Sequence, residues 1–273
     1  MTGYRYPNEH LILGLTVLLV LGVIAFTSLA TLCGSAAFVL VMVALAYGLN
    51  RSHHAALLRR AQPVSAQQLP GLAALVQATT ARLDVRGVEV WVAPARGLNA
   101  YTFGLTEPRP IVLFAGLLPV MDRDELQFIL GHELGHVQLG HTWLNSLLGG
   151  MAGIPSPFGA AVLLYFAFRW WNRACEFSAD RAGLLACGRV DKAVSALVKL
   201  ATGGAARNPA SLQQALTILE RQDDDPGQIV NELLSTHPLI ARRVEELRRF
   251  AASAEYHRWR AVSDANAARA GSA

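Results

Sequence analysis

Two histidines and a glutamate near the middle of the chain have the spacing of a metal site. Residues 131–136 read Gly-His-Glu-Leu-Gly-His, which places His132 and His136 four residues apart. Positions four apart on a helix differ by only ~40° around its axis, so both imidazoles can face one metal ion. Glu133 would project beside them, where it could take a proton from a metal-bound water. Because so short a motif also recurs by chance, the remaining sequence must supply a third ligand.

The histidine that follows the motif is a poor third ligand. A catalytic zinc takes three protein ligands and leaves one position open. His141 lies five residues past His136, about 140° around a continuous helix, so we expect it to point away and to have a structural or helix-end role. A metzincin would place a glycine and its third histidine where this chain has Leu139 and Thr142. The sequence therefore excludes that class.

An acidic pair about 40 residues downstream is better placed. Residues 176–180 read Glu-Phe-Ser-Ala-Asp, so Glu176 and Asp180 share one face if this segment is helical. A second helix packed on the first could offer Glu176 to zinc, while Asp180 accepts a proton from a ligand imidazole. Such a pair alone is typical of a solvated helix face, but after an HExxH motif it indicates the missing ligand and its support.

The elements expected before these residues are a small sheet and two helices. Three short apolar segments are predicted strands: 88–92, 99–104 and 111–114. A helix is expected over 72–83, and Asp122, three residues before Glu125, resembles a capping box that starts the motif helix over 125–139. This order of elements predicts an α+β domain that is mostly helical.

Helices dominate the second half of the chain. The apolar pattern predicts them over 176–188, 191–202, 210–222, 228–235 and from after Pro238 to about 250. The catalytic domain is therefore expected over 62–250. The remaining Ala-rich tail, 251–273, is weakly specified and is expected to fray.

The first 61 residues read as a membrane anchor. The segment 11–49 contains no charged side chain and is about twice as long as one bilayer crossing requires. A break at residues 33–35 divides it into a hairpin of two transmembrane helices, about 11–32 and 36–49. A cleaved signal peptide is the competing interpretation, but the apolar run is too long for one.

Basic residues around this anchor indicate its orientation. Arg5 precedes the apolar run, and Arg51, Arg59 and Arg60 follow it. Because basic residues favour the cytoplasmic side, both ends and all downstream sequence are expected there. We therefore predict a multi-pass protein of the inner (plasma) membrane whose catalytic domain faces the cytoplasm. The three cysteines suggest no disulfide framework, which suits a reducing compartment.

Composition supports a membrane setting and excludes nucleic acid as a partner. Of the 273 residues 52% are hydrophobic and 16% are charged, and the mean hydropathy is +0.31. So little charge is unusual for a soluble domain and indicates membrane segments. The net charge of +4 is dispersed, and arginines occur in pairs rather than in the runs that a nucleic-acid surface needs.

A second apolar stretch, 147–171, lies between the two halves of the expected site. Pro155 and Pro157 interrupt it. A single membrane crossing there would put Glu176 on the opposite side from His132. Two crossings would need about 40 residues plus a turn, which is the whole length of chain between the two motifs. We therefore favour a hairpin that dips into the membrane or lies on its surface, with a buried core helix as the alternative.

The combination of motifs resembles a known family. HELGH at 132–136 followed by EFSAD at 176–180 is similar to the HtpX-like and CAAX-prenyl-protease-related membrane zinc metalloendopeptidases, which are gluzincins. Asn99-Ala100 and the segment 235–238, Ser-Thr-His-Pro, fit the same family, and the resemblance covers about residues 65–250. Its members usually have two transmembrane segments where this chain has one broken apolar stretch. Tyr101 and Thr102 replace the small residues that commonly follow the Asn-Ala pair.

The resemblance implies roles for residues outside the metal motif. The strand that begins at Asn99 would border the cleft and pair with an extended substrate through Asn99, Ala100 and Tyr101. His237 and Arg243 would approach the zinc and stabilise the oxyanion. Partners would thus be protein or peptide substrates in extended form and the lipid bilayer.

The expected activity is that of a membrane-anchored zinc metalloendopeptidase with one Zn²⁺ per chain. His132, His136 and Glu176 would hold the metal, Asp180 would support a ligand, and Glu133 would act as general base on the zinc-bound water. A role in membrane-protein or misfolded-protein quality control is the leading hypothesis. The alternatives are a dedicated processing protease for one substrate and a non-catalytic pseudoprotease scaffold, although a scaffold would need none of these residues.

Overall fold

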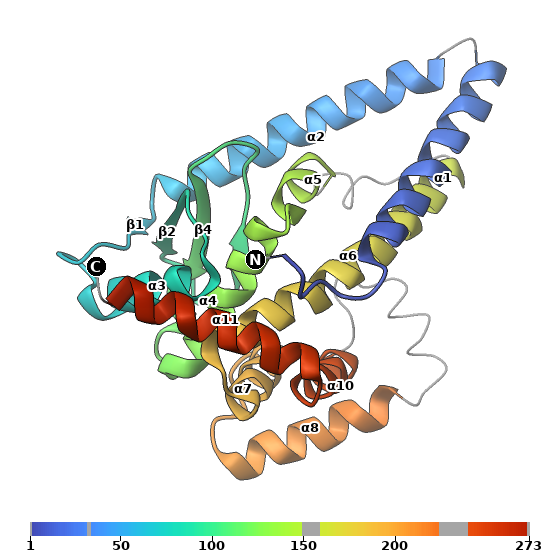
Figure 1. The fold of residues 1–273 in the computed structure, drawn as a ribbon. Helices are drawn as coiled ribbons and strands as arrows, with labels where there is room; N and C mark the ends of the chain where they lie inside the picture. The colour runs from blue at the N-terminus through green and yellow to red at the C-terminus, as the bar shows by residue number, and fades with distance from the viewer. Residues whose placement is uncertain (1, 32–33, 149–158, 224–239, 272–273) are drawn as a thin grey trace.

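A computed structural model describes residues 2–31, 34–148, 159–223 and 240–271, and it is mostly helical with one small mixed sheet (Figure 1). The helices and strands occur in the order α1 (Glu9–Ala30), α2 (Gly34–Leu58), β1 (Gln62–Pro63), α3 (Pro70–Leu83), β2 (Val88–Ala93), β3 (Ala100–Thr102), β4 (Arg109–Phe114), a 3₁₀ turn η1 (Ala115–Leu117), α4 (Arg123–Gln138), α5 (His141–Leu148), α6 (Gly159–Cys187), α7 (Val190–Ala201), α8 (Pro209–Asp223), α10 (Ile240–Ala251) and α11 (Ala254–Gly271). The predicted α+β class is confirmed.

The sheet has a short strand at each of its two edges. Its strand order is β1-β2-β4-β3, with β2 parallel to β4 and the outer strands antiparallel to their neighbours. Val92, Ile111 and Leu113 are buried, as expected for strands that cover a core on one face. Because β3 is the last strand in this order, its outer side is available to pair with another extended segment.

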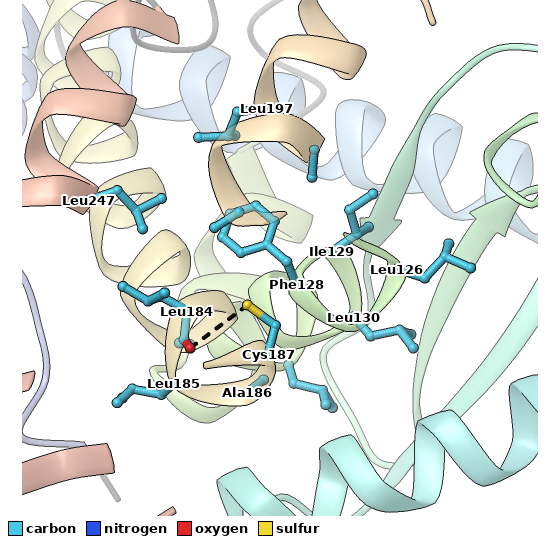
Figure 2. Packing of buried hydrophobic residues seen from close by; sticks show 14 of the residues in the cluster. Leu126, Phe128, Ile129, Leu130, Leu184, Leu185, Ala186, Cys187, Leu197 and Leu247 are labelled. Carbon is cyan, nitrogen blue, oxygen red and sulfur yellow. Dashed lines mark hydrogen bonds between the residues drawn. The ribbon is translucent and has the colours of Figure 1, made fainter. Parts of the chain in front are cut away.

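The hydrophobic core lies between the motif helix α4 and the second half of α6 (Figure 2). Leucines, Phe128 and Ile129 of α4 face the end of α6, and α7 and α10 close the cluster with Leu197 and Leu247. Phe128, Leu197 and Leu247 are almost fully buried. This core fixes the two helices that carry the predicted metal ligands.

Glycines allow α4 and α6 to approach very closely. A Cβ added at Gly131 would lie 2.5 Å from the Cβ of Ala186, and one added at Gly135 would lie 2.6 Å from the Cβ of Ala182. Gly183 of α6 is equally tight, because an added Cβ there would lie 2.7 Å from the backbone oxygen of Phe128. The small residues at this contact therefore set the distance between the histidines of α4 and the carboxylates of α6.

We predict that Gly135→Ala destabilises the protein by separating α4 from α6. Overfilling a packed contact of this kind costs about 1–3 kcal/mol in the free energy of unfolding. Gly71→Ala is the matched control, because Gly71 is also helical but an added Cβ there meets nothing within 4 Å. Thermal unfolding of the full chain in detergent micelles should show a lower midpoint for Gly135→Ala and an unchanged or higher one for Gly71→Ala. Equal midpoints would contradict the tight contact.

The two N-terminal helices differ in their surroundings. Residues 9–29 of α1 have a mean hydropathy of 2.6, and α1 is the helix, among the described residues, that is long and apolar enough to cross a membrane. Its Leu18, Phe26 and Leu29 are more than 70% exposed. Figure 1 shows α1 beside the first part of α6, whereas α2 extends toward α5 and the sheet. The helices predicted over 11–32 and 36–49 are thus present, but α2 continues to Leu58.

Two predicted helix boundaries differ from the structure. The helix expected to begin at Glu176 is the end of α6, which has 29 residues and starts at Gly159 within the second apolar stretch. The prediction that the tail frays from Ala251 onward is wrong for most of its length. Helix α11 packs on α3 and α6, and its Tyr256 and Ser263 are buried. The turn region of the predicted membrane-dipping hairpin, 149–158, and the predicted helix over 228–235 lie outside the described residues.

Candidate metal centre

Three side chains from α4 and α6 converge on one point. The Nε2 atoms of His132 and His136 are 3.2 Å apart, and Glu176 places its carboxylate oxygens 3.7 Å from the first and 3.4 Å from the second. In a tetrahedral zinc site with bonds of about 2.0–2.1 Å the ligand atoms are ~3.3 Å apart. The observed separations are therefore close to those that a zinc ion held by two imidazole nitrogens and the Glu176 carboxylate would require.

Local sequence explains why the ligands meet. Asp122 and Glu125 form a reciprocal capping box at the start of α4, as predicted, and this fixes the beginning of the helix that carries both histidines. The last two turns of α4 contain the glycines that contact α6. Glu176 and Asp180 are one helical turn apart on α6, on the side that faces α4. The predicted arrangement of two packed helices is confirmed.

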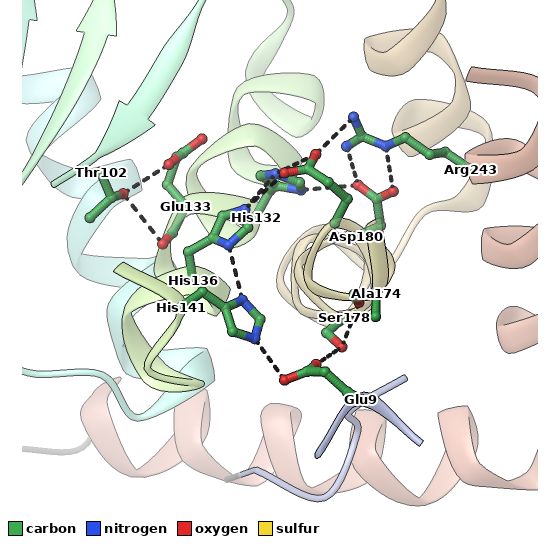
Figure 3. A network of polar contacts seen from close by, with 11 residues as sticks. Glu9, Thr102, His132, Glu133, His136, His141, Ala174, Ser178, Asp180 and Arg243 are labelled. Atoms are coloured by element: carbon green, nitrogen blue, oxygen red, sulfur yellow. Dashed lines mark hydrogen bonds and ion pairs between the residues drawn. The ribbon is translucent and has the colours of Figure 1, made fainter. Parts of the chain in front are cut away.

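The nitrogen of His132 that faces away from the convergence point is held by Asp180. His132 Nδ1 lies 3.0 Å from Asp180 Oδ1, and the Arg243 guanidinium donates to both Asp180 oxygens at 2.8 and 2.6 Å (Figure 3). Burial raises the pKa of Asp180, but the Arg243 cation outweighs burial and holds that pKa below its ordinary value. An ionised Asp180 accepts the His132 proton at Nδ1 and leaves the lone pair at Nε2 for a metal.

Arg243 lies close to Glu176, and most of its guanidinium is already engaged in contacts with carboxylates. Its Nη1 lies 3.1 Å from Glu176 Oε2, in addition to the two hydrogen bonds to Asp180. It is buried and lines the cleft. The side chain thus balances the charge of the Glu176 and Asp180 carboxylates. His237, the other predicted oxyanion group, lies outside the described residues.

Glu133 projects into the same cleft without joining the three ligand atoms. Its Oε2 accepts a hydrogen bond of 2.8 Å from the Thr102 hydroxyl, which lies at the end of β3 (Figure 3). The side chain is only 5% exposed. In the sequence Thr102 is distinguished only by its departure from the family pattern. The contact that orients the carboxylate joins residues 31 positions apart and has no local sequence signal.

The cleft beside the ligands has a volume of about 380 Å³ and is bordered by the edge strand. Asn99, Ala100 and Tyr101 all line it, as the family resemblance implied. The Asn99 carbonyl accepts from the Phe114 backbone N–H at 2.9 Å, which ties this segment to β4. Burial raises the pKa of Tyr101 to about 12, so its hydroxyl is neutral at physiological pH.

His141 does not have the position expected for it. The motif helix ends at Gln138, Gly140 turns the chain with a φ of 79°, and His141 begins α5. Its Nδ1 lies 3.0 Å from His136 Nδ1, and its Nε2 lies 3.0 Å from Glu9 Oε1. The prediction that it points away from His136 is wrong because the helix does not continue. The expectation that His141 is not the third ligand is retained, since the groups at the convergence point belong to His132, His136 and Glu176.

Comparisons with known proteins agree with this geometry. The family model described as "Peptidase family M48" matches residues 66–251. Plastoglobule-localized metallopeptidase 48 of Arabidopsis thaliana is 30% identical over 208 residues, which cover 71% of this chain and 60% of the plant protein. A protease HtpX homolog of Moorella thermoacetica is 29% identical over 236 residues, which cover 72% of this chain and 78% of the HtpX homolog.

A solved structure shares the fold. The crystal structure of S. mikatae Ste24p superposes with a TM-score of 0.51 at 18% sequence identity, covering 88% of this chain and 65% of the Ste24p chain. This chain therefore spans less than two thirds of the plant metallopeptidase and of Ste24p. The region matched by the family model contains both helices of the convergence point and the edge strand.

Proposed function

Because the chain belongs to peptidase family M48, we propose that it is a zinc metalloendopeptidase that hydrolyses peptide bonds at a membrane. The observation that carries this proposal is the convergence of His132, His136 and Glu176 at separations that suit tetrahedral zinc, next to a buried carboxylate that is not a ligand. These residues fit one Zn²⁺ per chain. When bound, the ion would polarise a water molecule and the substrate carbonyl.

Glu133 is the general base in this proposal. Its carboxylate would take a proton from the attacking water and then deliver it to the leaving amine. The Thr102 hydroxyl, 2.8 Å from Oε2, would keep the carboxylate turned toward the cleft. Without such a contact a glutamate in an open cleft would sample several rotamers. Thr102 is therefore a positioning residue for Glu133.

Arg243 would have an electrostatic role. Its guanidinium is 3.1 Å from Glu176 and donates two hydrogen bonds to Asp180, so it balances the charge of both carboxylates. A guanidinium has five N–H groups, and those not used in these contacts could stabilise the oxyanion that forms at the substrate carbonyl. We assign His237 the same role from the family resemblance.

Substrates would bind in extended form along β3. This strand is at the edge of the sheet and borders the cleft, so an incoming segment could pair with Asn99, Ala100 and Tyr101 through main-chain hydrogen bonds. Main-chain pairing discriminates little between side chains. The site therefore suits many unfolded proteins, which favours a role in quality control of misfolded or membrane proteins.

The membrane setting rests on the N-terminal helices. A helix as apolar as α1, with its large side chains exposed, is stable in lipid rather than in water. We propose that α1 crosses the inner (plasma) membrane, that part of α2 over 36–49 provides a second crossing, and that the catalytic domain faces the cytoplasm.

We predict that zinc removal abolishes cleavage reversibly. The purified full chain in detergent micelles should contain one zinc ion per chain, and cleavage of an unfolded protein should stop after treatment with a zinc chelator. Adding Zn²⁺ back should restore cleavage, whereas Mg²⁺ should not, because nitrogen ligands favour zinc over magnesium. Elemental analysis and gel-based cleavage assays provide the measurements. Cleavage that persists in zinc-free protein would refute the proposed activity.

A further inference from the structure

The residues that precede the first apolar helix are built into the catalytic domain. Tyr4 is fully buried, and its hydroxyl donates to Gln138 Oε1 at 2.6 Å. The Tyr6 backbone N–H donates to Ser178 Oγ at 2.8 Å, so this segment contacts both α4 and α6. The segment 4–9 lies outside the region matched by the family model, which starts at residue 66.

Glu9, the first residue of α1, ends a chain of contacts that begins at a metal ligand. It is 3% exposed, and it accepts hydrogen bonds from His141 Nε2 at 3.0 Å and from the Ser178 hydroxyl (Figure 3). Arg5 forms an ion pair with the same carboxylate. His141 in turn lies 3.0 Å from His136 Nδ1. The apolar helix and the metal centre are therefore joined by two side chains.

The contacts allow only one arrangement of protons when His136 binds a metal. Coordination through Nε2 requires that the His136 proton is on Nδ1. That proton is donated to His141 Nδ1, which must then carry a lone pair. A neutral imidazole with a lone pair on Nδ1 has its proton on Nε2, and this proton is donated to the Glu9 carboxylate. Every nitrogen in the series then has a partner.

We propose that Glu9 and His141 are positioning residues that hold His136 in its metal-binding tautomer and orientation, so that the start of α1 is part of the metal centre. This inference rests on the proposed metal site. Asp180 supports His132 directly, whereas His136 is supported by a histidine and then a carboxylate. The two ligand histidines thus have different supports, one from α6 and one from the N-terminal helix.

The test measures zinc affinity rather than activity. Chelator competition on the full chain in micelles should give a Kd for zinc that is about 10–100-fold weaker in His141→Phe and about 10-fold weaker in Glu9→Gln. The visible spectrum of the cobalt(II)-substituted protein should change in both variants, since it reports the ligand geometry. Tyr4→Phe is the control: it removes a hydrogen bond of the same segment and should leave the Kd and the spectrum unchanged.

A double variant separates positioning from general loosening of the fold. If Glu9 acts only through His141, adding Glu9→Gln to His141→Phe should weaken zinc binding no further. Additive losses, or an equal loss in Tyr4→Phe, would show that the segment acts only by stabilising the fold and would overturn the proposal. Glu9→Gln preserves side-chain volume, so it decides the question alone if His141→Phe does not fold.

A second metal site is the competing explanation for the same cluster. Glu9, His141 and Cys175 have potential ligand atoms within 4.8 Å of one another. Two zinc ions per wild-type chain, reduced to one by Glu9→Gln, would overturn the positioning role. A wild-type affinity in Glu9→Gln would refute this inference but leave the proposed protease intact, whereas a wild type that binds no zinc would refute the protease itself.

Discussion

Replacing Glu133 with glutamine should lower kcat for cleavage of an unfolded protein by about 10²–10⁴-fold while one zinc ion per chain remains bound. Glutamine has nearly the same shape and can still accept the hydrogen bond from Thr102. It cannot take a proton from water at neutral pH. Glu133 is not one of the three convergent ligand atoms, so metal binding should be unaffected.

The measurement combines zinc analysis with single-substrate kinetics on the same preparation. Glu89→Gln is a suitable control because it makes the same chemical change at an exposed position of β2. It should leave both zinc content and kcat unchanged. Wild-type cleavage by the Glu133→Gln variant would mean that another group activates the water, and the assigned mechanism would be wrong.

Glu176→Gln should lose zinc itself. The change removes the anionic ligand, and an amide oxygen is a much weaker ligand for zinc than a carboxylate. It also takes away one of the two carboxylates that face the Arg243 cation. We expect zinc affinity to fall by more than the ~10–100-fold that applies to a residue supporting a ligand. Cleavage should be lost in proportion to zinc and return in part at high zinc concentration.

Glu133→Gln is the reciprocal control for this experiment. Both variants should lose activity, but only Glu176→Gln should lose metal, and thermal unfolding of metal-free protein should show that both remain folded. Full zinc occupancy in Glu176→Gln at low free zinc would place the third ligand elsewhere. The pair of variants therefore distinguishes a ligand from a base by a measurement that is independent of catalysis.

Local patterns were sufficient to predict the elements that carry the ligands. The capping box at Asp122 and Glu125 fixes the start of α4 within a few residues. Alternating apolar residues identify β2, and a continuous apolar run identifies β4. The spacing of the HExxH motif defines the relative direction of two side chains on one helix. Glu176 and Asp180 follow from the same helical geometry, because their positions one turn apart are a local property.

Contacts between distant segments could not be read from local patterns. His141 was expected to continue the motif helix, but Gly140 reverses the chain and places the imidazole against His136. Glu9 is 132 residues from its partner His141, and no spacing rule connects them. The helix α11 has little apolar periodicity in its Ala-rich sequence, so local patterns do not predict it, and it is stabilised by packing on α3 and α6.

The buried charges around the ligands favour an enzyme over a scaffold. Asp180 and Arg243 are both buried and hydrogen-bonded to each other, an arrangement that is rarely more stable than apolar residues of the same size. The two residues contact His132 and Glu176, so their geometry is explained if they orient these side chains toward a metal. A dedicated processing protease would share this centre and would differ in the cleft beside Tyr101.

The position of Arg243 also has a consequence for biosynthesis. Its guanidinium is the cation that pairs with Asp180 and contacts Glu176, yet it belongs to α10, long after both carboxylates in the order of translation. A ribosome-bound chain that has exposed α4 and α6 still has two uncompensated carboxylates beside its histidines. The cluster of Glu176, Asp180 and Arg243 is therefore complete only after α10 has been synthesised.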